Sequence, residues 1–232
     1  MAWRSQGSSN ASLVKNLSQN SLITKDKVRK AMENTDRKHY SENNPYEDSP
    51  QRIGYAATIS APHMHAIALE YIHDQLTSGD QVTALDVGSG TGYLTACMAR
   101  MAGAGGRVVG LEHIPELAEV SVKNLNNDDS SLLQSGQVKI VIGDGRNGYA
   151  PHYDQQTELY DAIHVGAAAK EVPKALLNQL KRNGRLIVPV GPHGGTQSFQ
   201  QWDKDANGEL HQKELMKVRY VPLTDKEKQL RF

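Results

Sequence analysis

The sequence predicts an α/β fold with a doubly wound, mostly parallel sheet of the Rossmann-like kind. Short apolar runs rich in β-branched residues alternate with helical patterns, which is typical of parallel strands joined by right-handed crossovers. A glycine-rich turn directly after the first run is typical of a strand-to-helix connection that binds a nucleotide. The predicted strands are Thr83–Val87, Arg107–Glu112, Val138–Ile142, Leu159–Val165 and Arg185–Val190.

Both ends of the chain differ from this alternating core. The N-terminal part is polar and contains two amphipathic stretches, which predict short helices, and Pro62 then suits the first turn of a further helix. Near the C-terminus, Gln197–Asp203 and Leu215–Pro222 flank an Asn-Gly turn and predict an antiparallel pair at the sheet edge. We therefore expect a single domain over residues 1–232, with an N-terminal helical extension at 1–56, a cofactor-binding core at 57–196, and antiparallel strands and a tail at 197–232.

Composition narrows the class of partner. Lys plus Arg number 26 and Asp plus Glu number 26, so no overall charge draws the protein to nucleic acid or to a membrane. Cys97 is the single cysteine, which excludes an intramolecular disulfide, and its helical context predicts a small core residue. The histidines lack metal-site spacing, so we expect no metal. The N-terminus carries no apolar leader, and we expect a soluble, cytosolic monomer.

The stretch "ALDVGSGTGYL" (Ala84–Leu94) contains the glycine turn. Gly88, Gly90 and Gly92 occupy alternate positions, and the acid Asp86 precedes them. A dinucleotide-binding turn would have its third glycine at position 93, where the pyrophosphate approaches the backbone, but this position holds Tyr93. The turn therefore favours a nucleotide ligand that lacks a pyrophosphate.

The residues after the next strands favour an adenosine ligand. In an open α/β sheet the ligand lies beyond the carboxyl ends of the strands. Glu112 ends the second strand and can accept hydrogen bonds from both ribose hydroxyls, with His113 beside it. After the third strand, Asp144 could accept the adenine amine, and Gly145 would let the ring approach. Taken singly, Glu112 could be a solvated strand end and Asp144 a plain turn residue.

Among adenosine ligands, S-adenosylmethionine fits this pattern better than a dinucleotide. Its amino group and sulfonium are cationic, so Asp86 would attract them, whereas it would repel phosphates. Its carboxylate could bind the amides of the glycine turn. Two rival functions stay open at this point. A nicotinamide-dependent oxidoreductase would bind NAD, and a catalytically silent adenosine-binding protein would bind the cofactor without turnover.

At these residues the chain resembles the protein-L-isoaspartate (D-aspartate) O-methyltransferases of the animal type. The resemblance implies a class I methyltransferase fold, with S-adenosylmethionine as cofactor and S-adenosylhomocysteine as product. It also implies that damaged proteins and peptides with isoaspartyl residues are the substrates. The segments that carry it are "ATISAPHMHA" (Ala57–Ala66), "ALDVGSGTGYLTA" (Ala84–Ala96), "VVGLEHIPEL" (Val108–Leu117), "GDGRNGY" (Gly143–Tyr149), "YDAIHVGAAA" (Tyr160–Ala169), "GRLIVPVGP" (Gly184–Pro192) and "YVPLTDKEKQ" (Tyr220–Gln229).

The resemblance also implies the roles of particular residues. Ser60 would be the catalytic residue, at the junction of cofactor and substrate, and Thr224 and Gln229 of the tail would close over the cofactor. Two of these residues have structural alternatives: Ser60 could cap the following helix, and Thr224 could form a capping box with Glu227. The full cofactor-binding set is Ile59, Ser60, Ala61, Pro62, His65, Asp86, Gly88, Thr91, Glu112, His113, Asp144, Gly145, Thr224 and Gln229.

The implied reaction methylates the free α-carboxylate of an isoaspartyl residue. The ester then closes to a succinimide, which partly reopens as normal aspartate, so the activity initiates repair. An α-carboxyl group has a reference pKa of about 3.3 to 3.7 and is ionised at neutral pH. The sequence therefore predicts catalysis by positioning and by removal of water, without a general base.

Overall fold

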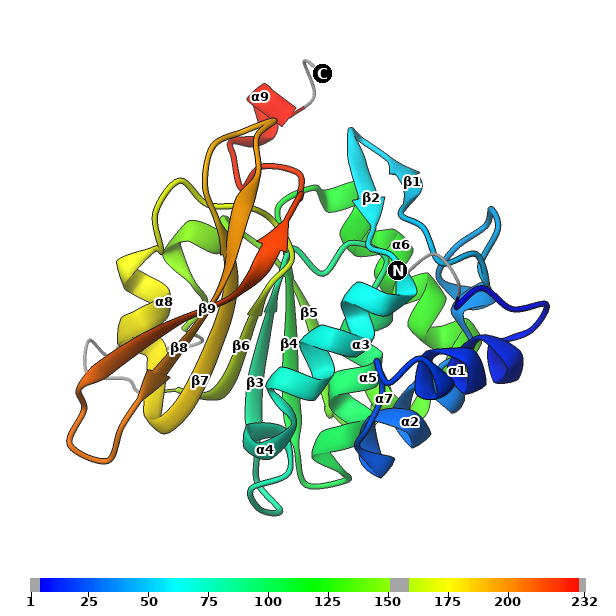
Figure 1. The fold of residues 1–232 in the computed structure, drawn as a ribbon, viewed down its shortest axis with the longest axis horizontal. Coiled ribbons are helices and arrows are strands. Elements are labelled where there is room, and N and C mark those ends of the chain that lie inside the picture. Colours follow the sequence, from blue (N-terminus) through cyan, green and yellow to red (C-terminus); the bar gives the residue numbers. More distant parts are fainter. Residues whose placement is uncertain (1–4, 151–158, 230–232) are drawn as a thin grey trace.

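The computed structural model describes residues 5–150 and 159–229. Within them, seven strands form one sheet in the order β5-β4-β3-β6-β7-β8-β9 (Figure 1). Neighbours from β5 to β7 pair in parallel, and β8 and β9 pair antiparallel at one edge, which confirms the predicted fold class. The strands are β3 (Thr83–Val87), β4 (Arg107–Glu112), β5 (Val138–Ile142), β6 (Tyr160–Val165), β7 (Leu180–Val190), β8 (Gln197–Lys204) and β9 (Leu210–Val218).

The order of the strands places a crevice at the carboxyl end of β3. Strand β3 pairs with β4 on one side and with β6 on the other, so the direction of winding reverses there. The chain leaves β3 at Gly88 and leaves β6 at Gly166, whose amide donates to the Val87 carbonyl at 2.8 Å. Ligands of doubly wound sheets bind at such a reversal, and the predicted site residues follow these same strands.

Hydrophobic side chains cover both faces of the sheet. Alternate residues of one strand point to opposite faces, so Ala84 packs in one cluster and Leu85 in the other. The first cluster includes Leu69 of α3 and Met98 of α5, and the second includes Leu176 of α8. The helices of the core are α3 (Pro62–Tyr71), α4 (His73–Leu76), α5 (Tyr93–Ala102), α6 (Pro115–Asp129), α7 (Ser131–Gln134) and α8 (Lys174–Gln179).

The single cysteine lies inside this core. Cys97, in the middle of α5, is fully buried in the first hydrophobic cluster. Burial raises the pKa of its thiol to about 11. The burial confirms the prediction of a core residue. A buried and protonated thiol is also a poor nucleophile.

The N-terminal part contains the expected helices and also a hairpin that the sequence did not reveal. Helix α1 (Asn10–Gln19) and helix α2 (Asp26–Glu33) contribute to the same cluster as α3 and α5, and so does Tyr40, which follows a 3₁₀ turn η2 (Arg37–His39). They are followed by strands β1 (Gln51–Gly54) and β2 (Ala57–Ile59). The hairpin spans the boundary that we expected at residues 56 and 57. Its turn was hard to predict because Tyr55 and Ala56 adopt φ values of 51° and 52°, which such residues rarely do.

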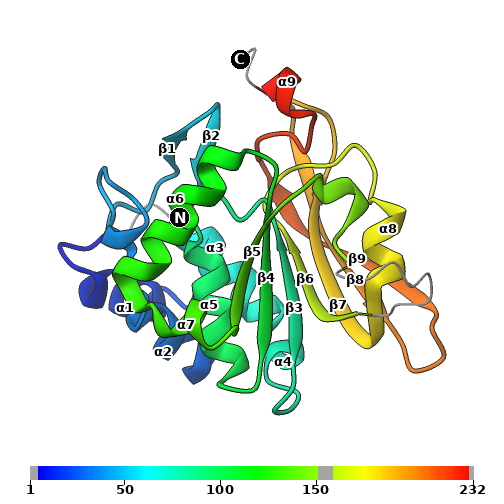
Figure 2. The ribbon, with the colours of Figure 1, turned by 180° about the vertical axis from the view of Figure 1, so that it is seen from behind.

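The C-terminal part corrects one boundary. Strand β8 agrees with prediction to within one residue, but β9 begins at Leu210 and ends at Val218, so the prediction of Leu215–Pro222 was several residues too late. Its first residues, Leu210 to Glu214, are exposed and polar at most positions, so they lack the apolar alternation that marks a strand. The resulting long hairpin extends one edge of the sheet (Figures 1 and 2).

The end of the tail returns to the carboxyl ends of the parallel strands. Figure 1 shows the short helix α9 (Lys226–Gln229) and the β1–β2 hairpin at the same end of the molecule. Between β9 and α9 the chain runs beside the segment after β6, where the Ala168 amide donates to the Val221 carbonyl at 2.7 Å and the Leu223 amide to the Ala168 carbonyl at 2.8 Å. The tail thus covers the crevice at the switch point.

Candidate active site

The glycine turn adopts a backbone that requires glycine. Gly88, Gly90 and Gly92 have φ values of 77°, 55° and 88°, all in the left-handed region that side chains disfavour. Gly92 is also the N-cap of α5, and a Cβ there would lie 2.6 Å from the Ser121 Oγ of α6. Tyr93, in place of a third glycine, is 1% exposed and packs into the core beneath the turn. The turn is therefore held close to α6 and to the end of β3.

The amides of the turn are largely used within the protein. Those of Gly88 and Ser89 donate to the Leu111 carbonyl at 2.8 and 3.2 Å, and that of Gly90 donates to Glu112 at 2.9 Å. For these three amides the expectation that they are available to a cofactor carboxylate was wrong, because they tie the turn to β4. The buried hydroxyls of Ser89 and Thr91 instead have no partner among the described residues. Buried polar groups need partners, so these hydroxyls indicate a polar ligand at the turn.

Glu112 is a structural centre of the site. Its side chain accepts from the Gly90 amide at 2.9 Å and from the amides of His113 and Ile114 at 2.8 and 3.0 Å. It is only 4% exposed, so the alternative of a solvated strand end was wrong. A carboxylate with three amide donors is held in place before any ligand arrives.

Asp86 is buried beneath the turn. Its two oxygens bind the Thr95 hydroxyl at 2.6 Å and His164 Nδ1 at 2.8 Å. His164 lies on β6, the strand beside β3. Sequence reasoning did not assign His164 a role. This histidine begins the segment "HVGAAA", in which the chain leaves β6. These bonds fix the orientation of the Asp86 carboxylate.

The segment after β5 is organised around an ion pair. Asp144 caps the 3₁₀ turn η3 (Gly145–Asn147) through the Arg146 amide, and its carboxylate also binds the Arg146 guanidinium at 2.6 Å. The Arg146 hydrogen bond lowers the pKa of Asp144. Glycine at 145 has a packing reason, because a Cβ there would lie 2.2 Å from Val87 Cγ1.

Two small cavities at the switch point bring most of the predicted residues together. We call them the cofactor cavities. One, of about 60 Å³, is lined by Gly88, Glu112, His113, Gly145, Thr224 and Gln229 among others. The second, of about 30 Å³, is lined by Ile59, Ser60, His65, Asp86, Gly88 and Thr91 among others.

The tail closes the first cofactor cavity through Gln229. This side chain lies 2.8 Å from His113 Nε2 through its Oε1 and donates to the Tyr55 carbonyl at 2.9 Å through its Nε2. It therefore joins the tail to β4 and to the β1–β2 hairpin. Thr224 lines the same cavity. Helix α9 begins at Lys226, so the residue directly before the helix is Asp225 and not Thr224. The capping-box alternative for Thr224 was therefore wrong.

Ser60 lies where a third cavity meets the second. This cavity, of about 380 Å³, is lined by Ser60, Ala61, Tyr220 and Gln229 among others, and we call it the substrate cavity. Ser60 is not a helix cap, because Ala61 is the N-cap of α3 and the Asp48 carboxylate accepts from the His63 amide of its first turn at 2.9 Å. Burial raises the pKa of Tyr220, and a hydrogen bond between its side chain and that of Ser60 opposes this shift. Pro62 and Asp144, which were also predicted, line none of these three cavities.

His65 is held beneath Ser60 by a residue that sequence reasoning missed. Arg37 of η2 places Nη1 3.1 Å from His65 Nδ1 and donates from Nη2 to the Ser60 carbonyl at 2.6 Å. Burial, and then the Arg37 charge, lower the pKa of His65 well below its ordinary value. The signal for Arg37 was weak, because it lies in the polar N-terminal part, for which only two short helices were predicted.

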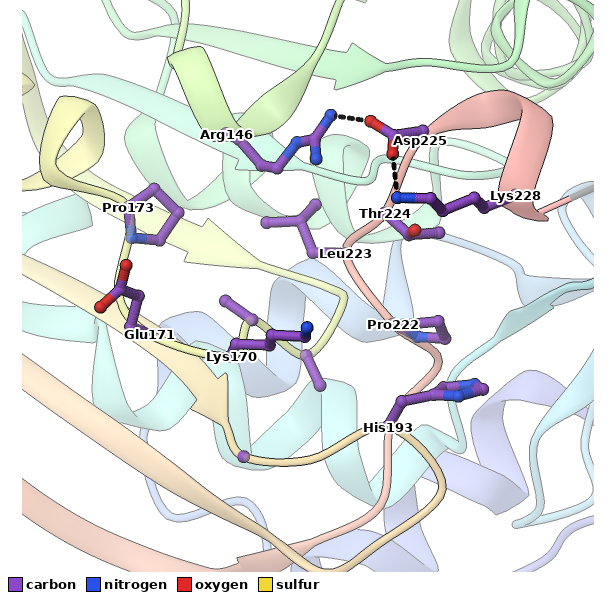
Figure 3. Close-up of a pocket in the computed structure, with 13 residues that line it drawn as sticks. Arg146, Lys170, Glu171, Pro173, His193, Pro222, Leu223, Thr224, Asp225 and Lys228 are labelled. Atoms are coloured by element: carbon purple, nitrogen blue, oxygen red, sulfur yellow. Dashed lines mark hydrogen bonds and ion pairs between the residues drawn. The ribbon is translucent and has the colours of Figure 1, made fainter.

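A larger cavity lies on the other side of the tail. Its volume is about 790 Å³, and Figure 3 shows Arg146, Asp225 and Lys228 linked along one side of it. Pro222, Leu223 and Thr224 line both this cavity and a cofactor cavity, so the tail separates the two. Because the strand-end acids and the glycine turn line the smaller cavities, we place the site there.

The fold and the site define a class of protein. A seven-stranded sheet with an antiparallel edge, a glycine turn after β3 and a buried acid at the end of β4 are the features of an S-adenosylmethionine-dependent class I methyltransferase. Residues 8–228 match the family described as protein-L-isoaspartate(D-aspartate) O-methyltransferase. The chain belongs to this family.

Individual relatives agree. A protein-L-isoaspartate O-methyltransferase of Caenorhabditis elegans is 51% identical over 99% of this chain and 98% of its own. Protein-L-isoaspartate O-methyltransferase 1 of Arabidopsis thaliana is 49% identical over 96% of this chain and 94% of its own. A Plasmodium falciparum crystal structure, described as such a methyltransferase in complex with S-adenosyl-L-homocysteine, superposes with a TM-score of 0.86 and 35% identity over 94% of this chain and 99% of that one.

The activity follows from membership of the family. The protein is an S-adenosylmethionine-dependent enzyme that methylates isoaspartyl residues of damaged proteins, a repair reaction. The alternatives of a nicotinamide-dependent oxidoreductase and of a silent adenosine-binding protein are thereby rejected. Among residues 5–150 and 159–229, no helix is both long enough and apolar enough to cross a membrane.

Proposed function

We propose that the cofactor cavities hold S-adenosylmethionine and that Ser60 holds the isoaspartyl carboxylate beside it. The observation that carries this assignment is the place of Ser60, whose side chain borders both the second cofactor cavity and the substrate cavity. The unpartnered hydroxyls of Ser89 and Thr91 support the cofactor's placement, because its amino and carboxylate groups would satisfy them. The same set would place the ribose at Glu112 and the tail residues Thr224 and Gln229 over the cofactor.

The residues of the chain act by positioning. When bound, the cofactor supplies a methyl group on a positively charged sulfur. The Ser60 hydroxyl donates a hydrogen bond to the substrate carboxylate, and the buried walls exclude water from it. No residue needs to remove a proton, because the carboxylate is already ionised. Burial lowers the pKa of His65, which makes it a poor proton acceptor, so we assign it no role as a general base.

Ser60→Ala tests this assignment, with Thr58→Val as the matched control. Thr58 is an exposed residue that borders the same two cavities, so its variant removes a hydroxyl from the same junction. We expect Ser60→Ala to lower kcat on an L-isoaspartyl peptide about 100-fold. We expect its dissociation constant for S-adenosylhomocysteine, measured by calorimetry, to stay within about twofold, because positioning acts chiefly in the transition state. A large loss of kcat in Thr58→Val, together with near-normal kcat in Ser60→Ala, would show that the hydroxyl of Thr58 has the role that we assign to Ser60.

The substrate and the setting of the enzyme complete the proposal. The ordinary aspartyl isomer of the same peptide is expected to give no methyl ester, since its side-chain carboxylate lies at a different distance from the chain. We also propose that the protein acts as a monomer in the cytosol. Residues 1–4 of the expected extension and residues 230–232 of the expected tail lie outside the described residues.

A further inference from the structure

Arg37 is a buried charge without an acidic partner in contact. Its side chain is 0% exposed, and it forms no ion pair with any residue in the described ranges. Asp48 is near enough to favour its charge, but burial still lowers the pKa of the guanidinium. A guanidinium stays protonated in proteins nonetheless. Burying an unpaired charge is strongly unfavourable, so the residue calls for a functional explanation.

The contacts of Arg37 lead to residues that line the second cofactor cavity, and one of them, Ser60, also lines the substrate cavity. Nη2 donates to the Ser60 carbonyl at 2.6 Å, and Nη1 lies 3.1 Å from His65 Nδ1. The guanidinium also lies over the Tyr93 ring, 5.1 Å from its centroid. Since a guanidinium can only donate, His65 must accept at Nδ1 and carry its proton on Nε2. Arg37 therefore fixes both a backbone carbonyl and a histidine tautomer.

The bond to the Ser60 carbonyl sets the plane of the next peptide. This peptide is trans, so its carbonyl and its amide point in opposite directions. The carbonyl points to the buried Arg37, and the Ala61 amide of the same peptide consequently points away from it. That amide has no acceptor among the described residues, and Ser60 and Ala61 both line the substrate cavity. The peptide thus offers a free N–H donor beside the Ser60 hydroxyl.

We propose that Arg37 is a positioning residue for the methyl transfer, because it locks the Ser60–Ala61 peptide so that the Ser60 hydroxyl and the Ala61 amide together hold the isoaspartyl carboxylate. This inference rests on the role proposed for Ser60. Arg37 does not touch the substrate. Its hydrogen bond also polarises the peptide, which makes the Ala61 amide a stronger donor to an anion.

The test compares Arg37→Met and Arg37→Lys with Arg100→Met. Arg100 of α5 also holds the N-terminal part, through Thr35 at 2.9 Å, and it binds Asp128 of α6 at 2.9 Å, but it does not contact Ser60. We expect Arg37→Met to lower kcat/KM on an L-isoaspartyl peptide about 10- to 100-fold, since small misplacements at a reacting group have effects of this size. S-adenosylhomocysteine binding should change less than about threefold, and Arg100→Met should keep near-normal kinetics even if its melting temperature falls.

The other variants separate a positioning role from stability alone. Arg37→Lys keeps a cation that can donate to the Ser60 carbonyl, so it should recover part of the lost kcat/KM. In Ser60→Ala, the further change of Arg37 to Met should lower kcat/KM less than it does in the unchanged protein, because the two residues act together. Equal kinetic losses in Arg37→Met and Arg100→Met, or fully multiplicative losses with Ser60→Ala, would overturn the proposal for Arg37. A Ser60→Ala variant with normal turnover would instead refute the proposed function.

A measurement on the unchanged protein keeps the inference testable even if the Arg37 variants do not fold. With S-adenosylhomocysteine bound, addition of the L-isoaspartyl peptide should move the Ala61 amide proton downfield in a nitrogen-edited NMR spectrum. The aspartyl isomer should leave it in place. An Ala61 amide that does not respond to the isoaspartyl peptide contradicts the proposal.

Discussion

The floor of the cofactor site and the tail that covers it both use carboxylates, but in opposite surroundings. On the floor, Asp86 and Glu112 are 1% and 4% exposed and bind backbone amides, a hydroxyl and a histidine. In the tail, the Asp225 side chain is 34% exposed and pairs with Arg146 and Lys228. Buried, hydrogen-bonded groups hold one geometry, whereas exposed ion pairs add little to stability. The floor is therefore permanent, and the tail is the part expected to open for cofactor exchange.

The largest effect should come from the floor. Glu112→Ala removes the acceptor of three amides and the proposed partner of the ribose. We expect it to weaken S-adenosylhomocysteine binding by about 2 to 3 kcal/mol, measured by calorimetry. Glu112→Gln keeps one acceptor oxygen, so its affinity for S-adenosylhomocysteine should lie between those of the unchanged protein and Glu112→Ala. Unchanged binding in a folded Glu112→Ala variant would limit this residue to a backbone role.

Replacement of Asp86 should lower the free energy of unfolding more than replacement of residues in the tail does. In Asp86→Ala, His164 and Thr95 lose their partner in the buried interior. We expect the free energy of unfolding, measured in urea, to fall by about 1 to 3 kcal/mol, the usual effect of leaving buried polar groups unsatisfied. An unchanged free energy of unfolding would show that this part of the floor can rearrange. It would then differ less from the tail than we propose.

A smaller effect is expected for Gln229, which joins the tail to the floor. Gln229→Ala removes its contacts with His113 and with the Tyr55 carbonyl. We expect about fivefold weaker S-adenosylhomocysteine binding through faster release, because a hydrogen bond contributes about 1 kcal/mol, with little change in kcat on saturating substrates. Lys226→Ala on the same short helix is the control. Equal effects of the two changes would attribute the loss to the helix as a whole.

The smallest effect should be that of Asp225. Hydrogen bonds to Lys228 and then Arg146 lower the pKa of Asp225 to about 2. Because the folded pKa lies below the unfolded one, the ion pairs stabilise the protein above about pH 4 and lose this effect as the pH falls through about 2. We expect Asp225→Asn to lower the melting temperature by at most about 2 °C at neutral pH and low salt. The difference should vanish in 1 M salt and near pH 2.

The parts of the fold with a strong pattern were predictable from sequence. Strands β3, β4 and β5 agree with prediction residue for residue, because they are short apolar runs between clear helical patterns. The β1–β2 hairpin was missed since its turn places Tyr55 and Ala56 in a conformation with no sequence signature. Strand β7 begins at Leu180, earlier than the predicted Arg185, because its first residues include polar and exposed positions.

Site residues were predictable where a strand ends, and less so where the chain returns from afar. Asp86 and Glu112 follow directly from the strand pattern, and Ser60 came from the family resemblance. Arg37 was not found, because its partners Ser60 and His65 lie 23 and 28 residues away and only tertiary packing brings them together. The use of the turn's amides by Leu111 also depends on how β3 and β4 pair, which no local pattern encodes.

The burial of Cys97 gives the protein a built-in reporter of its own unfolding. As the single thiol, enclosed in the core of α5 and with its pKa raised to about 11, it should react with a thiol reagent only when the core opens. Labelling followed over time by mass spectrometry would then measure the frequency of that opening without any added probe. The extent of labelling at Cys97 would thus report how often the core of this repair enzyme opens.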